Sequence, residues 1–65
     1  MSVVSTIRPG HKIITAGKTF EVVGSMKLRG RYLYKAIDAQ SRRIVSLSRD
    51  DVLEAQRDGS ATVSA

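Results

Sequence analysis

The sequence predicts a mainly β fold: a small antiparallel barrel of four to five strands, with one short helix near the C-terminus. Three observations lead to this prediction. Runs of β-branched and aromatic residues alternate with short, glycine-containing turns. The spacing of apolar residues changes from the strand period to the helix period at Ser48. The chain has 65 residues and is 42% hydrophobic, enough for one small core, so a single domain over 1–65 is expected.

The first predicted hairpin follows a segment without clear periodicity. Residues 1–9 lead into a turn signal, Pro9-Gly10, and we expect a flexible arm there. The first strand is predicted at 12–15 and the second at 19–28, joined by a tight turn at Gly17. Both strands are rich in residues that favour a pleated sheet.

Alternation within the second strand assigns its two faces. Phe20, Val22, Met26 and Leu28 share one face at a period of two. Gly24 falls on the same face and marks a position for a bulge or sharp bend, which small closed barrels need at their corners.

The third predicted strand, 32–38, carries apolar side chains on both faces. Leu33 and Ile37 lie on one face, and Tyr32 and Tyr34 lie on the other. Because either face could bury apolar groups, the pattern leaves the inward face open.

The fourth strand is predicted at 43–48, and a helix follows it. Ser48 takes the N-cap position, with Asp51 three residues later in a capping box, and Gly59 ends the helix. Acidic residues in the first turn and an arginine in the last match the helix dipole. A helix this short needs a sheet to pack on, and 61–65 could add a short fifth strand.

One short helix cannot cover both faces of such a sheet. A sheet curled into an SH3-like barrel buries both faces most economically, and an open sheet with the helix packed across it is the alternative. The expected core comprises Phe20, Val22, Leu28, Ile44 or Val45, Leu47, Val52 and Leu53.

The charge is large for the size of the chain and unevenly distributed. The net charge is +5, with a pI near 10.3. Residues 1–48 hold nine cations and two anions, whereas residues 49–65 hold two cations and four anions. This asymmetry suggests a polyanionic partner, although a net charge of this size also serves solubility.

The sequence offers few groups for catalysis or metal binding. It contains no cysteine, and His11 is its single histidine. Helix capping and the helix dipole account for the carboxylates around Asp51. We therefore expect no enzyme activity, no cofactor and no metal. The absence of a signal-peptide pattern and of a membrane-spanning apolar run predicts a cytoplasmic protein without a membrane partner.

The densest basic stretch, 26–35, flanks a predicted tight turn at Gly30. Crowding cations onto one tip is mildly unfavourable, which favours a functional role for them. A β-ribbon can enter a DNA groove, and arginine suits phosphate and guanine contacts. The two tyrosines could stack on bases where exposed, and we expect at least one to be buried. The predicted nucleic-acid-binding residues are Lys27, Arg29, Arg31, Tyr32, Tyr34, Lys35, Arg42 and Arg43, the last two in the next turn, at the opposite end of a simple meander.

Two stretches, the hairpin "AGKTFEVVG" and the later "IVSLSRDDVLEAQRDGSA", lie on either side of the basic hairpin. In these two stretches the chain resembles the small β-barrel segment attached to the catalytic core of Mu-like and related DDE-type transposases. Those segments show a "G-x-x-[FY]-x-V" hairpin followed by a "[LV]-S-x-x-[DE]-[LV]" helix that ends at glycine. The resemblance covers most of 10–61. It implies a free-standing, DNA-associated barrel of phage or mobile-element origin, without the catalytic acidic triad and without transposition. The matching residues are Gly17, Phe20, Val22, Leu47, Ser48, Asp51, Val52 and Gly59.

Three functions fit these patterns. The first is a nucleic-acid-binding module, with DNA favoured over RNA, that contacts phosphates through its basic hairpin. The alternative is a protein–protein interaction barrel, a phage- or plasmid-type adaptor or inhibitor that binds an acidic protein surface. The third is an assembly component whose basic side meets the acidic helix of another copy. No exposed apolar cluster of the kind found at the centre of protein interfaces is evident from the sequence, which favours the first function. The sequence leaves the oligomeric state open.

Overall fold

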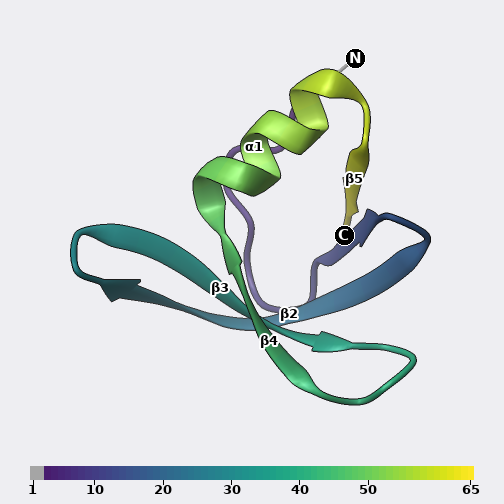
Figure 1. Ribbon diagram of the computed structural model, residues 1–65, viewed down its shortest axis with the longest axis horizontal. Coiled ribbons are helices and arrows are strands. Elements are labelled where there is room, and N and C mark those ends of the chain that lie inside the picture. The colour runs from purple at the N-terminus through teal and green to yellow at the C-terminus, as the bar shows by residue number, and fades with distance from the viewer. Residues whose placement is uncertain (1–2) are drawn as a thin grey trace.

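The computed structural model describes residues 3–65, which form one antiparallel sheet and one helix (Figure 1). The strand order within these residues is β4-β3-β2-β1-β5. The expected mainly β meander with a short C-terminal helix is confirmed, including the fifth strand. The elements are β1 (Lys12–Thr15), β2 (Lys18–Leu28), β3 (Arg31–Asp38), β4 (Ile44–Ser48), α1 (Arg49–Asp58) and β5 (Ala61–Ser64).

The sheet curls strongly but does not close into a barrel. In the described residues β4 pairs only with β3, and β5 pairs only with β1, so both remain edge strands. Figure 1 shows α1 crossing above the curved sheet from the end of β4 toward β5. The ten-residue helix connects β4 to β5, and these two edge strands do not pair with each other in the described residues. The arrangement is compatible with an SH3-like barrel that has been left open.

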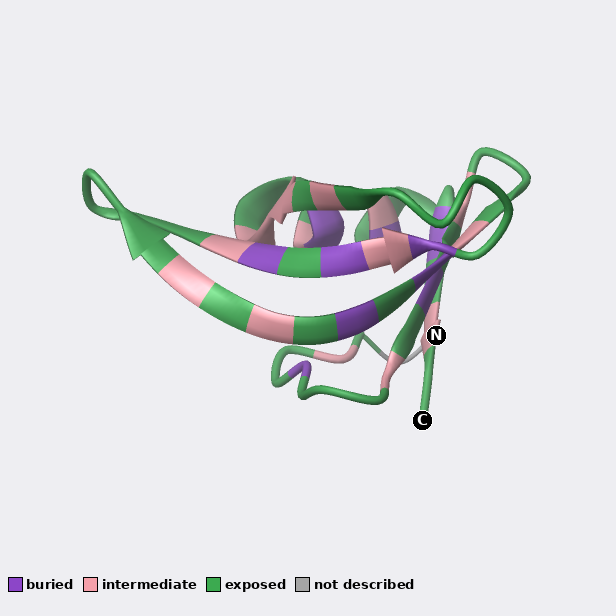
Figure 2. Ribbon diagram, turned by 90° about the horizontal axis from the view of Figure 1, so that it is seen from below, coloured by how far each residue is buried: buried purple, intermediate pink, exposed green. Residues whose placement is uncertain are grey.

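The core lies on one face of the sheet, called here the inner face, beneath α1. Alternating buried and exposed residues along β2 and β3 are visible in Figure 2. Val45 and Leu47 pack against the core and are half-buried. Leu53, which was also expected in the core, is half-buried but lies outside the core cluster. The buried core residues include Ile7, Ile13, Phe20, Val22, Tyr34, Ala36 and Val52.

A β-bulge at Val23 changes the faces of the second strand. The register with β3 shifts between Val22 and Gly24, where the sequence indicates a bulge. Beyond it Met26 lies on the opposite, outer face, and Leu28 there is 52% exposed. The expectation that both share a face with Phe20 is therefore wrong, because the inserted residue turns every later side chain over.

In the fourth strand, the structure decides which of two predicted residues belongs to the core. Ile44 was one of two candidates for the core, and it is 67% exposed because it pairs with Ile37 on the outer face. Its neighbour Val45 pairs with buried Ala36 and takes the core position instead.

Two side chains of the N-terminal segment, Val4 and Ile7, pack in or against the core; a flexible arm was predicted over 1–9, of which residues 1 and 2 lie outside the described part of the chain. Ile7 is buried among the core residues. The Val4 amide donates to Oε1 of Gln56 at 2.8 Å, and Nε2 of Gln56 donates back to the Val4 carbonyl at 3.0 Å. At the end of the segment, the Arg8 amide donates to Nδ1 of His11 at 3.0 Å. The buried side chain of Ile7 thus fixes this segment to the core, and the two hydrogen bonds between Val4 and Gln56 fix it to α1.

The two ends of α1 differ in how they are capped. Gly59 ends the helix with φ 85°, as expected, and its amide bonds back to the last turn. Ser48 occupies the N-cap position but makes no side-chain capping bond, so the expected capping box with Asp51 does not form. Ser48 still pairs with Leu33 on the outer face, which directs its side chain away from the helix. Among residues 3–65, no helix has the length and apolar character needed to cross a membrane.

Candidate nucleic-acid interface

The β2–β3 hairpin ends in a two-residue turn that holds an arginine in a strained conformation. Leu28 and Arg31 close the turn, and both of its central residues have positive φ, 52° for Arg29 and 80° for Gly30. Such turns suit the twist of a hairpin. Glycine adopts this conformation without strain, whereas an ordinary side chain costs about 1–2 kcal/mol there. A cation therefore occupies the outermost position of the hairpin at the expense of stability.

Tyr32 gathers two further cations at this end of the sheet. Its side chain is 44% exposed and lies across the strand pair from Lys27. The Lys27 ammonium lies 5.3 Å from the ring centre, and the Arg49 guanidinium carbon lies 4.1 Å from it. Both distances are typical of cation–π contacts, so the ring holds two positive groups near the hairpin tip.

Arg49 was absent from the residues predicted for the site. It is the first residue of α1, and β4 ends just before it at Ser48, which pairs with Leu33. The strand pairing therefore delivers Arg49 beside Tyr32. Charge counting along the sequence placed Arg49 with the acidic C-terminal segment. Its position directly after a strand paired with the tyrosine strand is the signal that could have identified it.

The two tyrosines have different roles. They lie on the same face of β3, as expected, but Tyr34 is buried in the core while Tyr32 is exposed. Burial raises the pKa of Tyr34, and the nearby charge of Arg49 partly opposes this. Tyr34 is therefore a core residue, and Tyr32 is the exposed tyrosine at the hairpin end of the sheet.

The predicted cations do not gather at one place. We call Lys27, Arg29, Arg31, Tyr32 and Arg49 the tip cluster. Lys35 lies about halfway along β3 on the outer face, exposed to solvent. Arg42 and Arg43 lie in the β3–β4 turn at the other end of an eight-residue strand, roughly 25 Å from the tip. Figure 1 shows the two turns at opposite ends of the sheet.

The two turns also differ in their acidic residues. In the β3–β4 turn the carboxylate of buried Asp38 accepts hydrogen bonds from the amides of Gln40 (2.8 Å) and Ser41 (3.3 Å). These bonds hold the pKa of Asp38 below its ordinary value, and the charge of Lys18 adds to the effect. By contrast, the sequence between Glu21 and Asp38 contains no acidic residue. The β2–β3 hairpin tip therefore carries no carboxylate of its own, and the nearest acidic residues in sequence to the tip cluster are Asp50 and Asp51, which follow Arg49 in α1.

No group of three or more His, Cys, Asp or Glu side chains that could hold a metal ion occurs within residues 3–65. His11 accepts the Arg8 amide at Nδ1 and so stabilises the local turn. Comparisons of the chain with protein-family models, with curated proteins and with solved structures gave no significant match. The chemistry of the tip cluster is therefore the main guide to function.

Proposed function

We propose that the chain binds nucleic acid, with duplex DNA preferred, through phosphate contacts of the tip cluster. The observation that carries this proposal is the placement of four cations at one projecting end of the sheet, with Lys27 and Arg49 beside Tyr32, and with Arg31 on the outer face opposite Leu28. They come from β2, the β2–β3 turn, β3 and α1, and two of them contact Tyr32. Arginine guanidinium groups form paired hydrogen bonds with phosphate oxygens, which suits Arg29 and Arg31 at the tip.

Tyr32 supports binding by positioning cations before the ligand arrives. A long, flexible side chain loses rotamer freedom when it is fixed on a phosphate. Contacts of Lys27 and Arg49 with the ring restrict both side chains beforehand, and each such contact contributes about 0.5–1 kcal/mol at an exposed site. Because the ring is already engaged by cations, stacking on an unpaired base is disfavoured, which favours duplex DNA over single strands.

The resemblance to transposase-associated barrels adds weight to DNA as the ligand, and we propose that the protein meets it in the cytoplasm. An amide chemical-shift titration tests the proposal. Duplex DNA, single-stranded DNA and RNA of equal length are added separately at low salt. Duplex DNA should shift the amides of Lys27, Arg29, Arg31 and Arg49 most strongly. Shifts confined to Arg42 and Arg43, or no shift with any nucleic acid, would overturn it.

An acidic protein surface is the second candidate partner, and one observation favours it. The outer face of the sheet exposes Leu28 and Ile44, with half-buried Leu33 and Ile37 beside them. Lys35 lies between these groups on the same face. Protein interfaces combine an apolar centre with a charged rim. A protein partner on this face should shift the amides of Leu33 and Ile37 more strongly than those of Arg29 and Arg31.

A further inference from the structure

The charged residues of the sheet lie on its three central strands (β1, β2 and β3) and not on its two edge strands (β4 and β5). Neither edge strand contains a charged residue or a proline: β4 reads IVSLS and β5 reads ATVS. Every charged residue of the described sheet lies on the three inner strands. Proteins commonly place charges or proline on exposed edges, because these prevent pairing with another chain. An edge strand without charges or proline lacks these features that prevent pairing with a strand of another chain.

The main-chain groups of β4 that face away from β3 can be identified. The amide of Asp38 donates to the carbonyl of Arg43 at 2.9 Å, just before β4 begins. In an antiparallel ladder every second residue directs its N–H and C=O toward the partner strand. Val45 and Leu47 therefore bond to β3, while the N–H and C=O of Ile44 and Ser46 point away from it. Ser46 lies at the centre of this free edge.

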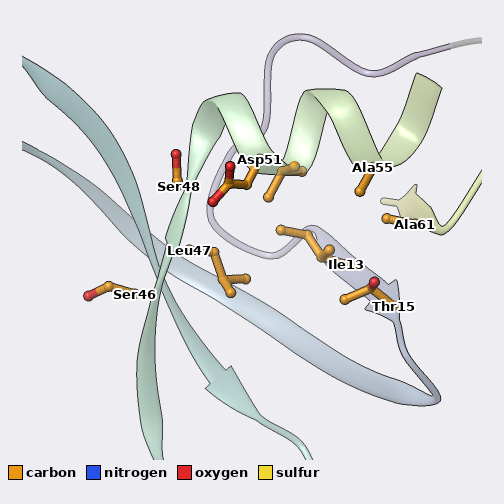
Figure 3. Close-up of a pocket in the computed structure, with 9 residues that line it drawn as sticks. Ile13, Thr15, Ser46, Leu47, Ser48, Asp51, Ala55 and Ala61 are labelled. Atoms are coloured by element: carbon orange, nitrogen blue, oxygen red, sulfur yellow. The ribbon is translucent and has the colours of Figure 1, made fainter. Parts of the chain in front are cut away.

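A cavity of about 230 Å³ lies beside this edge, between β4 and β1 and beneath α1. Leu47 and Ile13 point toward one another across it, while the side chain of Ser46 is turned away (Figure 3). Ala55 and Ala61 supply further apolar wall. A strand added to β4 would cover an apolar hollow as well as bond to the edge.

The residues that flank β4 are basic on one side and mostly acidic on the other. Arg42 and Arg43 precede the strand, and Arg49, Asp50 and Asp51 form the first turn of α1 directly after it. When two copies pair antiparallel about Ser46, Arg43 of one copy lies opposite Arg49 of the other, and the two aspartates follow just beyond Arg49. The basic pair of each copy is then on the same side as the aspartates of the other, and the Arg49 side chain contacts the Tyr32 ring of its own copy.

Antiparallel pairing about Ser46 is consistent with the directions of the main-chain groups of β4 and with the faces on which its side chains lie. Pairing about Ser46 sets Ile44 opposite Ser48 and Val45 opposite Leu47 of the second copy. Residues whose main-chain groups point away from β3, such as Ser46, then lie opposite one another. Val45 and Leu47, whose side chains lie on the inner face, also lie opposite one another. Pairing β4 with β5 of another copy would instead join the outer face of one sheet to the inner face of the next. The free edge of β4 therefore matches itself better than it matches β5.

We propose that two copies of the chain associate through antiparallel pairing of their β4 strands about Ser46, forming a two-fold symmetric dimer with one continuous sheet. A two-fold interface uses the same patch on both copies, as a self-complementary edge requires. The dimer places two tip clusters on one molecule. The inference does not depend on nucleic-acid binding, because the test described next contains no nucleic acid.

Sedimentation equilibrium of the full chain over a wide concentration range tests the proposal. The wild-type chain should follow a monomer–dimer equilibrium. Ser46→Pro removes the outward N–H without removing a bond to β3, and Ser46→Ala is the matched control that keeps this N–H. We expect Ser46→Pro to weaken the dimer about tenfold or more, because one hydrogen bond is lost from each copy, and Ser46→Ala to leave it nearly unchanged. A monomer at every concentration, trimers or larger assemblies, or equal behaviour of the two variants would overturn the proposal.

A measurement on the wild-type chain covers the case in which Ser46→Pro does not fold. A mixed sample of isotope-labelled and unlabelled chains is examined for nuclear Overhauser contacts between copies. Contacts between the Val45 methyl groups of one copy and the Leu47 methyl groups of the other are expected. Contacts between copies that involve β5 or α1 instead would contradict the β4 pairing.

Discussion

The guanidinium carbon of Arg49 lies 4.1 Å from the centre of the Tyr32 ring, which connects the first residue of α1 to the β2–β3 hairpin. Seventeen positions separate the two residues in the sequence, and the pairing of β4 with β3 brings them together. The contact adds a fourth cation to three that already crowd the hairpin tip. The proposed phosphate site is therefore a product of the fold as well as of a basic stretch of sequence.

The Tyr32 ring should matter more for DNA binding than its hydroxyl. Tyr32→Leu removes the ring that positions Lys27 and Arg49, whereas Tyr32→Phe keeps it. Cation–π contacts of about 0.5–1 kcal/mol each correspond to a loss of affinity of roughly two- to fivefold per contact. Fluorescence anisotropy with a short duplex should therefore show weaker binding for Tyr32→Leu and nearly unchanged binding for Tyr32→Phe. Equal losses in both variants would assign the effect to the hydroxyl.

Replacing the strained arginine of the tip should raise stability and lower affinity together. Arg29→Gly relieves a positive φ and should stabilise the fold by about 1 kcal/mol. Ala16→Gly is the matched control, because Ala16 has the same φ of 52° in the β1–β2 turn, far from the tip cluster. Urea unfolding should show similar gains for both variants, while only Arg29→Gly weakens DNA binding. If both variants bind DNA like the wild type, Arg29 has no part in the site.

The assignment of the strand faces predicts very different costs for two truncations in β2. Phe20→Ala removes a buried core side chain and should cost about 3–5 kcal/mol. Leu28→Ala removes a side chain that is largely exposed on the outer face and should cost about 0.5 kcal/mol or less. Urea denaturation curves of the two variants provide the comparison. Similar costs would show that the bulge at Val23 does not turn the strand over.

Asp38 should make the stability depend on acid pH. Its pKa is lowered in the folded state by the amides of Gln40 and Ser41, so the ionised carboxylate stabilises the fold. This contribution is complete above the ordinary carboxyl pKa and disappears as the pH falls through the lowered folded value. Asp38→Asn keeps an acceptor oxygen but does not titrate. The free energies of unfolding of the two proteins, measured from neutral to strongly acidic pH, should therefore converge on the acid side. Parallel curves would exclude Asp38 as the source.

The order and approximate bounds of the elements follow from local sequence patterns. Strand runs, glycine turns and the change of period at Ser48 are all short-range signals, and the structure places its elements accordingly. The position of the bulge was also indicated by Gly24. Its consequence for Met26 and Leu28 was missed, because strict alternation was continued through an inserted residue. A one-residue insertion cannot be recognised from the apolar pattern when both faces of the strand carry apolar groups.

Features that depend on contacts distant in sequence were less accessible. Whether β4 and β5 pair to close the barrel depends on how distant parts of the chain pack together, which local patterns do not specify. Arg49 joins the tip through strand pairing, although its neighbours in sequence are acidic. Ser48 has the residue type of an N-cap, but its place at the end of a paired strand directs its side chain away from the helix.

The salt dependence of duplex binding in two charge-matched variants tests the proposed phosphate site most directly. The tip variant combines Arg29→Gly with Arg31→Ala, and the control combines Arg42→Gly with Arg43→Ala. Each variant loses two positive charges and relieves one positive φ. The wild type, with four phosphate contacts, should give a slope of log K against log salt of about −3.6, and the tip variant should flatten it by about 1.8. The control should keep the wild-type slope. Equal flattening in both variants, or no binding by the wild type at low salt, would contradict a phosphate site at the tip cluster.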